Sequence, residues 1–136
     1  MIRRSDVDRL PVGDEVELMQ AVVHAGRHAR QVGFGEVDAA KVMTAASELA
    51  RNILKYAGRG AILVAGLDGP RGLGVEVVAE DSGPGIADVE AALRDHFSTA
   101  GTLGLGLPGV RRMMDEFEIA SAPGRGTRVT VRKWRP

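Results

Sequence analysis

The sequence predicts an α+β fold in which a mixed, mostly antiparallel sheet is covered on one face by helices. Apolar residues recur at helical spacing between about residues 14 and 56. Strand-like runs fill most of the remaining chain and are joined by short turns rich in Gly and Pro, as in hairpins. Because helices come first and hairpins follow, the two kinds of element are expected to form separate layers. The 136 residues are enough for a single domain over 1–136.

The first part of the chain is expected to hold an edge strand and two helices. Val7 and Leu10 with Pro11 suit a short edge strand before about Val12, because proline has no N–H to offer a neighbouring strand. A helix is predicted over 14–32, with Gly33 as its C-terminal cap, and a second helix over 37–56. The expected apolar faces consist of Val16, Met19, Val22, Val23 and Gly26 on the first helix, and of Val42, Ala46, Leu49 and Ile53 on the second.

The second part is expected to contain two hairpins with further helices between them. The elements are predicted as strands over 61–67 and 73–79, a short helix over 88–93, a loop over 97–106, a helix over 108–115, and strands over 117–121 and 127–133. The connections 68–72 and 123–126 contain Gly and Pro, which favours a tight turn at each. The strand over 73–79 alternates in polarity, so we expect only one of its faces to be buried.

Composition argues against several classes of function. Eighteen basic and eighteen acidic residues cancel, which leaves no electrostatic support for nucleic acid or an anionic membrane as a partner. Without cysteine there is no disulfide, thiolate metal site or cysteine nucleophile. The longest apolar run, 61–65, is far too short to span a bilayer, and the N-terminus lacks a signal-peptide pattern. We therefore expect a cytoplasmic protein.

The three histidines form no set with metal-ligand spacing. His24 and His28 lie four residues apart on the first predicted helix, and His96 stands far from both in the sequence. A zinc site with histidine ligands needs a spaced set of donors, so we expect no zinc. We expect His24 and His28 to be surface residues.

The stretch 80–85 carries the first candidate for ligand binding. Asp81 stands at the end of a predicted strand, and Gly83 and Gly85 permit a positive φ in the loop that follows. A carboxylate in this place can accept a hydrogen bond from an exocyclic amino group such as that of adenine, and a backbone without side chains leaves room for the ring. An ordinary surface turn uses the same residue types and stays open as the alternative.

Glu48 and Asn52 are the second candidate pair. They lie four residues apart on the second predicted helix, and therefore one turn apart on one side of it. This side borders the apolar face without belonging to it. A carboxylate and a carboxamide so placed can act as a proton acceptor and as an oxygen ligand for Mg²⁺. A solvated helix face is the alternative.

The Gly-rich loop 101–109 is the third candidate, because it precedes a predicted helix. Glycine N–H groups and a helix N-terminus offer partial positive charge to phosphate oxygens. Gly104, Gly106 and Gly109 formally match the dinucleotide-binding fingerprint, but that fingerprint needs a strand directly before it, and the preceding residues are loop-like. The P-loop motif is absent.

Hydroxyl side chains give weaker signals. Thr127 opens the last predicted strand and could present its hydroxyl toward the same site as Asp81, although a hairpin turn explains a β-branched residue there equally well. Nothing in the sequence suggests a histidine base for Ser98 or Thr99. Nucleophilic hydrolase chemistry therefore has little support.

The order of these motifs closely resembles that of the Bergerat-fold (GHKL) ATPases. It runs from Glu48-x-x-x-Asn52 on a helix to Asp81-x-Gly83-x-Gly85 after a strand, then to a Gly104-x-Gly106 loop before a helix, and then to Gly124-x-Gly126-Thr127. The superfamily includes the ATPase domains of type II topoisomerases, sensor histidine kinases and bacterial anti-sigma kinases. The resemblance covers about residues 33–134. It implies a two-layer α/β sandwich with a flexible ATP lid.

The resemblance also implies a role for each motif residue, with ATP and Mg²⁺ as cofactors. Glu48 would be the general base, Asn52 the Mg²⁺ ligand, and Asp81 the acceptor for the adenine amino group. The other residues implied at the ATP site are Gly83 and Gly85 in the adenine pocket, Ser98, Thr99, Gly104, Leu105 and Gly106 at the phosphate-binding lid, and Thr127, which would support the adenine side through Asp81 or a water molecule.

Longer strings narrow the resemblance to the RsbT-type serine/threonine switch kinases of stressosome systems. These strings are residues 47–53, 79–86, 97–99, 104–110 and 114–119. The resemblance implies phosphorylation of a STAS-domain scaffold or antagonist protein, followed by activation of a PPM-type phosphatase in a stress-signalling pathway. Two alternatives stay open: an anti-sigma factor kinase that binds a sigma factor directly, and a non-catalytic binding module that uses nucleotide only to order its lid.

Overall fold

The computed structural model describes residues 1–85 and 106–136. The helix predicted over 88–93, most of the loop predicted over 97–106, and the site candidates Ser98, Thr99, Gly104 and Leu105 lie outside these residues. The described elements are, in order, β1 (Arg3–Val12), α1 (Glu15–Gln31), α2 (Glu36–Tyr56), β2 (Gly60–Gly69), β3 (Gly72–Asp81), α4 (Gly106–Met113), β4 (Glu116–Ser121) and β5 (Thr127–Trp134).

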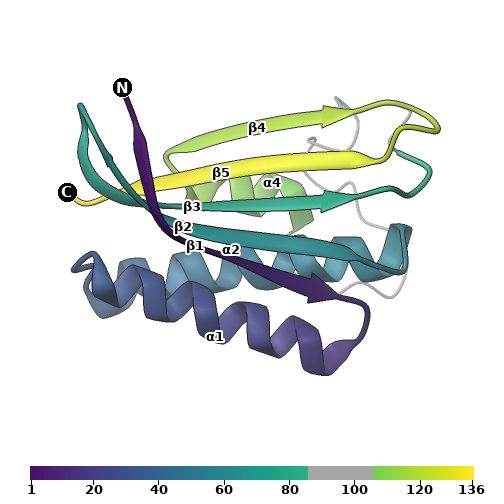
Figure 1. Ribbon diagram of the computed structural model, residues 1–136, viewed down its shortest axis with the longest axis horizontal. Coiled ribbons are helices and arrows are strands. Elements are labelled where there is room, and N and C mark those ends of the chain that lie inside the picture. Colours follow the sequence, from purple (N-terminus) through teal and green to yellow (C-terminus); the bar gives the residue numbers. More distant parts are fainter. Residues whose placement is uncertain (86–105) are drawn as a thin grey trace.

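The strands form a five-stranded sheet in the order β1-β2-β3-β5-β4. Every pair of neighbouring strands is antiparallel, and α1, α2 and α4 pack on one face of the sheet (Figure 1). This confirms the α+β fold and the layering predicted from the sequence. No helix in residues 1–85 or 106–136 combines the length and the apolar character needed to cross a membrane.

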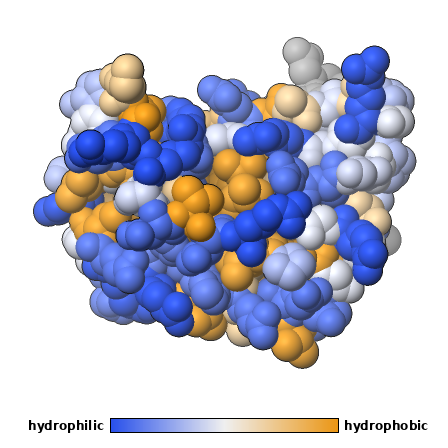
Figure 2. Space-filling model, viewed as in Figure 1, coloured by the Kyte–Doolittle hydropathy of each residue, from blue (hydrophilic) through white to orange (hydrophobic). Residues whose placement is uncertain are grey.

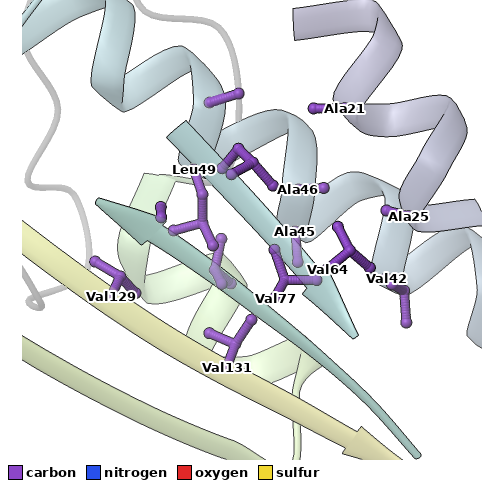
Figure 3. Close-up of a cluster of buried hydrophobic side chains, with 14 of the residues drawn as sticks. Ala21, Ala25, Val42, Ala45, Ala46, Leu49, Val64, Val77, Val129 and Val131 are labelled. Atoms are coloured by element: carbon purple, nitrogen blue, oxygen red, sulfur yellow. The ribbon is translucent and has the colours of Figure 1, made fainter. Parts of the chain in front are cut away.

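The core lies between the sheet and the helices, and valines supply most of its sheet side. The strands contribute Ile62 and Val64 from β2, Val75 and Val77 from β3, and Val129 and Val131 from β5. Val42, Ala46 and Leu49 of α2 face this side of the sheet (Figure 3), and Ile53 belongs to the same core, as predicted for that helix. Branched side chains at every second strand position pack well on a pleated surface, and this explains why one face of each strand is apolar.

The apolar face predicted for α1 is largely wrong. Val16, Met19 and Val23 are exposed, whereas the buried positions are mostly alanines and include Ala21 and Ala25. Small side chains let α1 approach α2 closely, and the larger apolar residues are left on the outside. Of the predicted face, Val22 is partly buried against the core. Gly26 is buried, and a Cβ there would meet the sulfur of Met43 at 2.8 Å.

Strand β1 is longer than predicted and is irregular at its centre. Its pairing with β2 shifts register between Ser5 and Asp8, and Asp6 has a φ of 53°.

The Asp8 Oδ2 atom lies 2.8 Å from His28 Nε2 and 3.3 Å from His24 Nδ1, and these hydrogen bonds lower the pKa of Asp8. His28 is only 3% exposed, so the expectation of a surface residue is wrong for it. The i,i+4 histidines tie α1 to the edge strand.

Strand β3 is buried on both faces rather than on one. Residues 74–79 are all buried, and the side chains of Glu76 and Val78 lie on the sheet face that no described helix covers. Long side chains from neighbouring strands cover this face instead. In the view of Figure 2 the hydrophobic surface is accordingly divided into separate patches by strongly hydrophilic residues.

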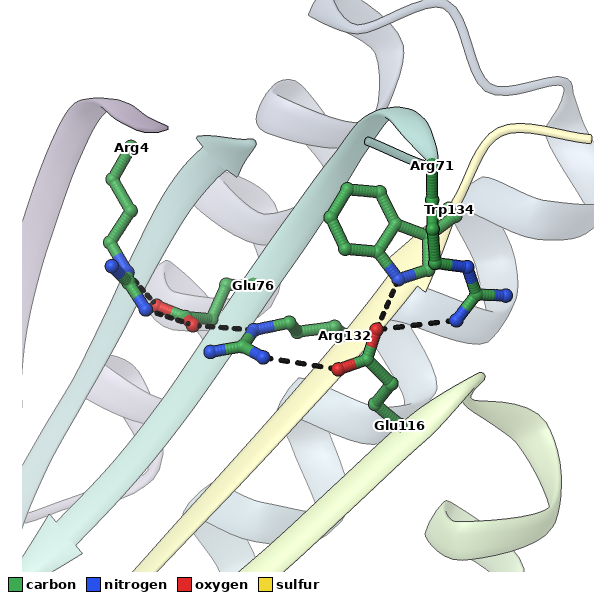
Figure 4. Close-up of polar contacts among 6 residues, drawn as sticks. All are labelled: Arg4, Arg71, Glu76, Glu116, Arg132 and Trp134. Carbon is green, nitrogen blue, oxygen red and sulfur yellow. Dashed lines mark hydrogen bonds and ion pairs between the residues drawn. The ribbon is translucent and has the colours of Figure 1, made fainter. Parts of the chain in front are cut away.

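A chain of ion pairs crosses the outer face of the sheet. Glu76 accepts hydrogen bonds from Arg4 Nε at 2.7 Å and from Arg132 Nε at 2.9 Å (Figure 4). Arg132 also donates to Glu116 at 3.0 Å, and Glu116 accepts from the Trp134 indole. Burial alone would raise the pKa of Glu76, but the two arginines outweigh it, and the pKa lies below its usual range.

Replacing Glu76 should make the free energy of unfolding less dependent on pH in the acidic range. A depressed carboxylate pKa stabilises the fold above the unfolded-state pKa, and this contribution is lost as the pH falls through the folded-state value. We expect Glu76→Gln to lower the free energy of unfolding at pH 7 by about 2 kcal/mol. The difference from wild type should shrink as the pH falls below about 4.3. Thermal melts between pH 7 and 3 check this. Glu118→Gln on β4 is the matched control because Glu118 is exposed. If Glu76→Gln differed from wild type by the same free energy at all pH values, the lowered pKa of Glu76 would be contradicted.

Candidate functional site

Asp81 ends β3 at the edge of the helix-covered face. Its neighbours across the sheet are Gly60 on β2 and Thr127 on β5. The Gly83 N–H donates a hydrogen bond of 2.9 Å to Asp81 Oδ1, which fixes the rotamer of the carboxylate. One carboxylate oxygen thus holds the loop, and the other remains available to a ligand.

The two glycines after Asp81 are required by close packing of the loop. A Cβ at Gly83 would come within 2.6 Å of the Ala57 Cβ. Gly85 has a φ of 79°, and a Cβ there would overlap the backbone oxygen of Ala122. Both positions therefore exclude other residues. Gly85 lines the cavity described next, whereas Gly83 acts through its hydrogen bond to Asp81.

A cavity of about 210 Å³ opens between α2, β3, β5 and the start of α4. Four of the predicted site residues line it, namely Asn52, Asp81, Gly85 and Thr127. The other lining residues, which sequence reasoning did not assign to the site, are Leu49, Ile53, Tyr56, Ala79, Pro84, Leu107 and Val129. Apolar walls with a few convergent polar groups suit a flat heterocyclic ligand. Leu49 and Ile53 were predicted as core residues. They belong to the core and also line the cavity, because the cavity adjoins the core.

Thr127 is oriented by Ser121, a residue that sequence reasoning missed. The Ser121 hydroxyl donates to the Gly126 carbonyl at 3.0 Å, and its oxygen lies 2.7 Å from the Thr127 hydroxyl oxygen. Because the single Ser121 proton is given to a carbonyl, the Thr127 hydroxyl must donate to Ser121. Thr127 can then only accept a hydrogen bond from a ligand or water. The hairpin register, which sets Ser121 opposite Thr127, is the signal that could have found it.

Glu48 lies one helical turn before Asn52 and is 8% exposed. The N–H of Gly106, the first residue of α4, approaches Glu48 Oε2 at 3.4 Å. Gly106 has a φ of 63°, a conformation that favours glycine. The structure thus brings Glu48, Asn52 and Gly106 together, although Glu48 does not line the cavity itself. A carboxylate so placed can accept a proton beside a group bound at the start of α4.

The donor set fits a hard cation only in part. Among the described residues, no three His, Cys, Asp or Glu side chains form a group that could hold a metal. Mg²⁺ commonly uses one or two protein oxygens and completes its shell with water and phosphate. The Asn52 carboxamide at the cavity is compatible with that mode of binding.

Comparison with known proteins identifies the fold family. Residues 13–133 match the model of the histidine kinase-like ATPase domain. The serine/threonine-protein kinase RsbT of Bacillus subtilis is 50% identical over 106 residues, which cover 78% of this chain and 80% of that protein. The anti-sigma F factor of Caldanaerobacter subterraneus is 34% identical over 70% of this chain and 69% of its own length. That of Thermoanaerobacter sp. strain X514 is 32% identical over the same shares.

These similarities confirm the predicted resemblance to RsbT-type kinases of the GHKL superfamily and the prediction of an ATP-dependent serine/threonine kinase. They also give a reason for the order of the motifs, since the family model spans Glu48, Asn52, Asp81 and Thr127. The chain belongs to the histidine kinase-like ATPase domain family.

Proposed function

We propose that the chain acts as one kinase domain over residues 1–136, in the cytoplasm, and transfers the γ-phosphoryl group of ATP to a hydroxyl of a STAS-domain scaffold or antagonist protein. The observation that carries the proposal is the cavity that Asn52, Asp81 and Thr127 share, with Glu48 one turn away on α2. Relatives named as a serine/threonine-protein kinase and as anti-sigma F factors support a partner-switching role.

The adenine ring would lie between the apolar walls of the cavity, with its amino group toward Asp81. The free carboxylate oxygen of Asp81 is the acceptor for that group, because Gly83 occupies the other. The Thr127 oxygen, whose proton is directed to Ser121, is a second acceptor for the amino group or for a bridging water. Leu49 and Val129 supply apolar surface on opposite sides of the cavity, from α2 and β5.

Replacing Ser121 tests how far the Thr127 hydroxyl depends on its neighbour. We expect Ser121→Ala to weaken ATP binding about fivefold, since loss of one hydrogen bond that orients an acceptor is worth about 1 kcal/mol. Titration calorimetry measures the change. Ser5→Ala, on β1, should leave the affinity unchanged, and an unchanged affinity for Ser121→Ala would show that Thr127 needs no such support.

Asn52 would hold Mg²⁺ through its carboxamide oxygen. When bound, Mg²⁺ neutralises the charge that develops on the phosphate oxygens. Asn52 faces the cavity from the same side of α2 as Glu48, so the ion and the base would both lie at the phosphate end of the nucleotide. The predicted phosphate contacts of Ser98, Thr99, Gly104, Leu105 and Gly106 belong to the same proposal.

Glu48 would accept the proton of the attacking hydroxyl. Phosphoryl transfer depends mainly on positioning and electrostatic stabilisation, and a base near the hydroxyl adds to them. The Gly106 N–H lies 3.4 Å from Glu48 Oε2, beside the start of α4, whose N-terminus favours negative charge; this supports a charged Glu48 as the base. In the transfer, the hydroxyl oxygen forms a bond to the γ-phosphorus, the bond to the β,γ-bridging oxygen breaks, and ADP leaves.

Phosphorylation of the STAS-domain protein would release this kinase to bind and activate a PPM-type phosphatase. The test immobilises the kinase and adds a STAS-domain protein and a PPM-type phosphatase from the same organism. We expect the STAS-domain protein to be retained until Mg·ATP is added, and then to appear in the eluate in phosphorylated form while the phosphatase is retained. An unmodified STAS-domain protein that stays bound after Mg·ATP would contradict the switch.

The similarity to anti-sigma F factors supports one alternative, in which the chain binds a sigma factor directly and phosphorylates the STAS-domain antagonist of that factor. Capture of a sigma factor, in place of a phosphatase, in the same immobilised assay would favour it.

A further inference from the structure

A second and larger hollow lies on the far side of Asp81 from the nucleotide cavity. It has a volume of about 1020 Å³ and runs along the end of the sheet, where β1 ends, β2 begins, β3 ends and β5 begins. In Figure 1 this is the end toward which the arrowheads of β1, β3 and β4 point. Many of its lining side chains alternate along their strands and belong to the sheet face that no described helix covers. We call this hollow the arginine groove.

Four arginines from four separate segments line the arginine groove. Arg9 comes from β1, Arg59 from the α2–β2 connection, Arg125 from the β4–β5 turn and Arg128 from β5. All four are exposed. They come from separate parts of the sequence, so the fold brings them together, and none of them belongs to a run of basic residues that would indicate a binding surface.

The charges of the arginine groove are only partly compensated. Glu80 lies between two arginines, 3.5 Å from Arg9 and 3.6 Å from Arg128, so one carboxylate is shared by two guanidinium groups. Arg59 and Arg125 form no ion pair with any residue in 1–85 or 106–136. The other acidic lining residues are Glu17, which accepts a hydrogen bond from the Gly13 N–H at 2.9 Å, and Asp81, which accepts one from the Gly83 N–H.

We propose that the arginine groove binds an acidic segment of a partner protein. Guanidinium groups match carboxylates in a two-point geometry, and those of Arg59 and Arg125 are available without loss of an ion pair to the described residues. The lining contains small exposed residues such as Gly13 and Ala120, which leave room for a polypeptide backbone. Among the described residues, the lining contains no aromatic side chain on which a nucleobase could stack. The net charge of the chain is zero, so single-stranded nucleic acid fits less well.

A fluorescent decapeptide of glutamate is the probe, and binding is measured by anisotropy at low salt without nucleotide. The outcome is therefore independent of the proposed kinase activity. We expect the wild-type protein to bind the peptide, and the double variant Arg59→Glu/Arg125→Glu to bind at least about tenfold more weakly, because two attractive charges become repulsive. Glu80→Gln should have the opposite effect and tighten binding, since it frees Arg9 and Arg128.

Two controls separate the groove from general basicity and from unfolding. Arg27→Glu reverses an exposed arginine on α1, outside the groove, and should bind the peptide like wild type. Arg59→Lys/Arg125→Lys keeps the charge but loses the two-point geometry, so it should bind the peptide more weakly than wild type and more tightly than the double reversal. Thermal melts establish that each variant is folded.

Three results would overturn the proposal. The first is absence of peptide binding by the wild-type protein, and the second is an equal loss of affinity in Arg27→Glu. The third is tighter binding of a ten-nucleotide thymidine oligomer than of the peptide, which would assign the arginine groove to nucleic acid. Weakening by the double reversal together with tightening by Glu80→Gln would establish it as a docking site for acidic polypeptide.

Discussion

Asp81→Asn should reduce ATP binding by about a hundredfold or more, because hydrogen bonds to charged groups contribute about 1.5–3 kcal/mol and the variant adds a donor facing a donor. The wild-type carboxylate has two acceptor oxygens, of which Oδ1 already accepts from Gly83 at 2.9 Å. In asparagine one of the two becomes an NH₂ group. If the remaining oxygen keeps the loop, the NH₂ group meets the adenine amino group; if it turns to adenine, the NH₂ group meets the Gly83 N–H.

Titration calorimetry with a non-hydrolysable ATP analogue measures this loss. Asp68→Asn is the matched control, because Asp68 lies near the end of β2, at the opposite end of the sheet, and forms an ion pair only with exposed Arg3 among the described residues. It should bind the analogue like wild type. Unimpaired binding by Asp81→Asn would remove Asp81 from the adenine side of the site, and with it the orientation proposed for the nucleotide.

Glu48→Ala should bind Mg·ATP nearly as well as wild type but transfer phosphate about 10²–10⁴ times more slowly, the range expected for loss of a general base. The separation of binding from transfer follows from the structure, because Glu48 lies outside the cavity lining whereas Asn52, one turn later, is part of it. Loss of the carboxylate removes a proton acceptor and leaves the adenine contacts unchanged.

The comparison needs both a binding measurement and single-turnover kinetics at saturating Mg·ATP. Glu36→Ala, an exposed residue in the first turn of the same helix, controls for general effects on α2. Full transfer activity in Glu48→Ala would rule Glu48 out as the base. A loss of binding equal to the loss of transfer would instead give Glu48 a structural role at the start of α4.

The local geometry around Asp81 could be predicted from the sequence because the relevant signals are local. A carboxylate at a strand end followed closely by two glycines is a pattern that lies within a few residues. The structure explains the glycines, because side chains at Gly83 and Gly85 would collide with Ala57 and Ala122. Likewise, the i,i+4 spacing of Glu48 and Asn52 fixes their relation on any helix. The antiparallel pairing of Asp81 with Thr127 confirms that these motifs meet, while the chemical roles remain predictions.

Features that depend on packing between distant segments were not predictable in this way. The exposed Val16 and Met19 follow helical spacing as well as the buried alanines do, and only the close approach of α1 to α2 decides which face turns inward. Glu76 reads as the polar position of a half-buried strand, yet arginines from β1 and β5 bury it. The arginine groove has no sequence signature, because its four side chains come from four segments.

The most direct test of the central claim is transfer of label from γ-labelled Mg·ATP to a STAS-domain protein from the same organism, with Glu48→Ala as the parallel sample and nucleotide binding confirmed in both preparations. The account predicts label on a serine or threonine of the STAS-domain protein with the wild-type kinase, and almost none with the variant. Nucleotide binding without label on that protein, or label that is equally strong with Glu48→Ala, would contradict it.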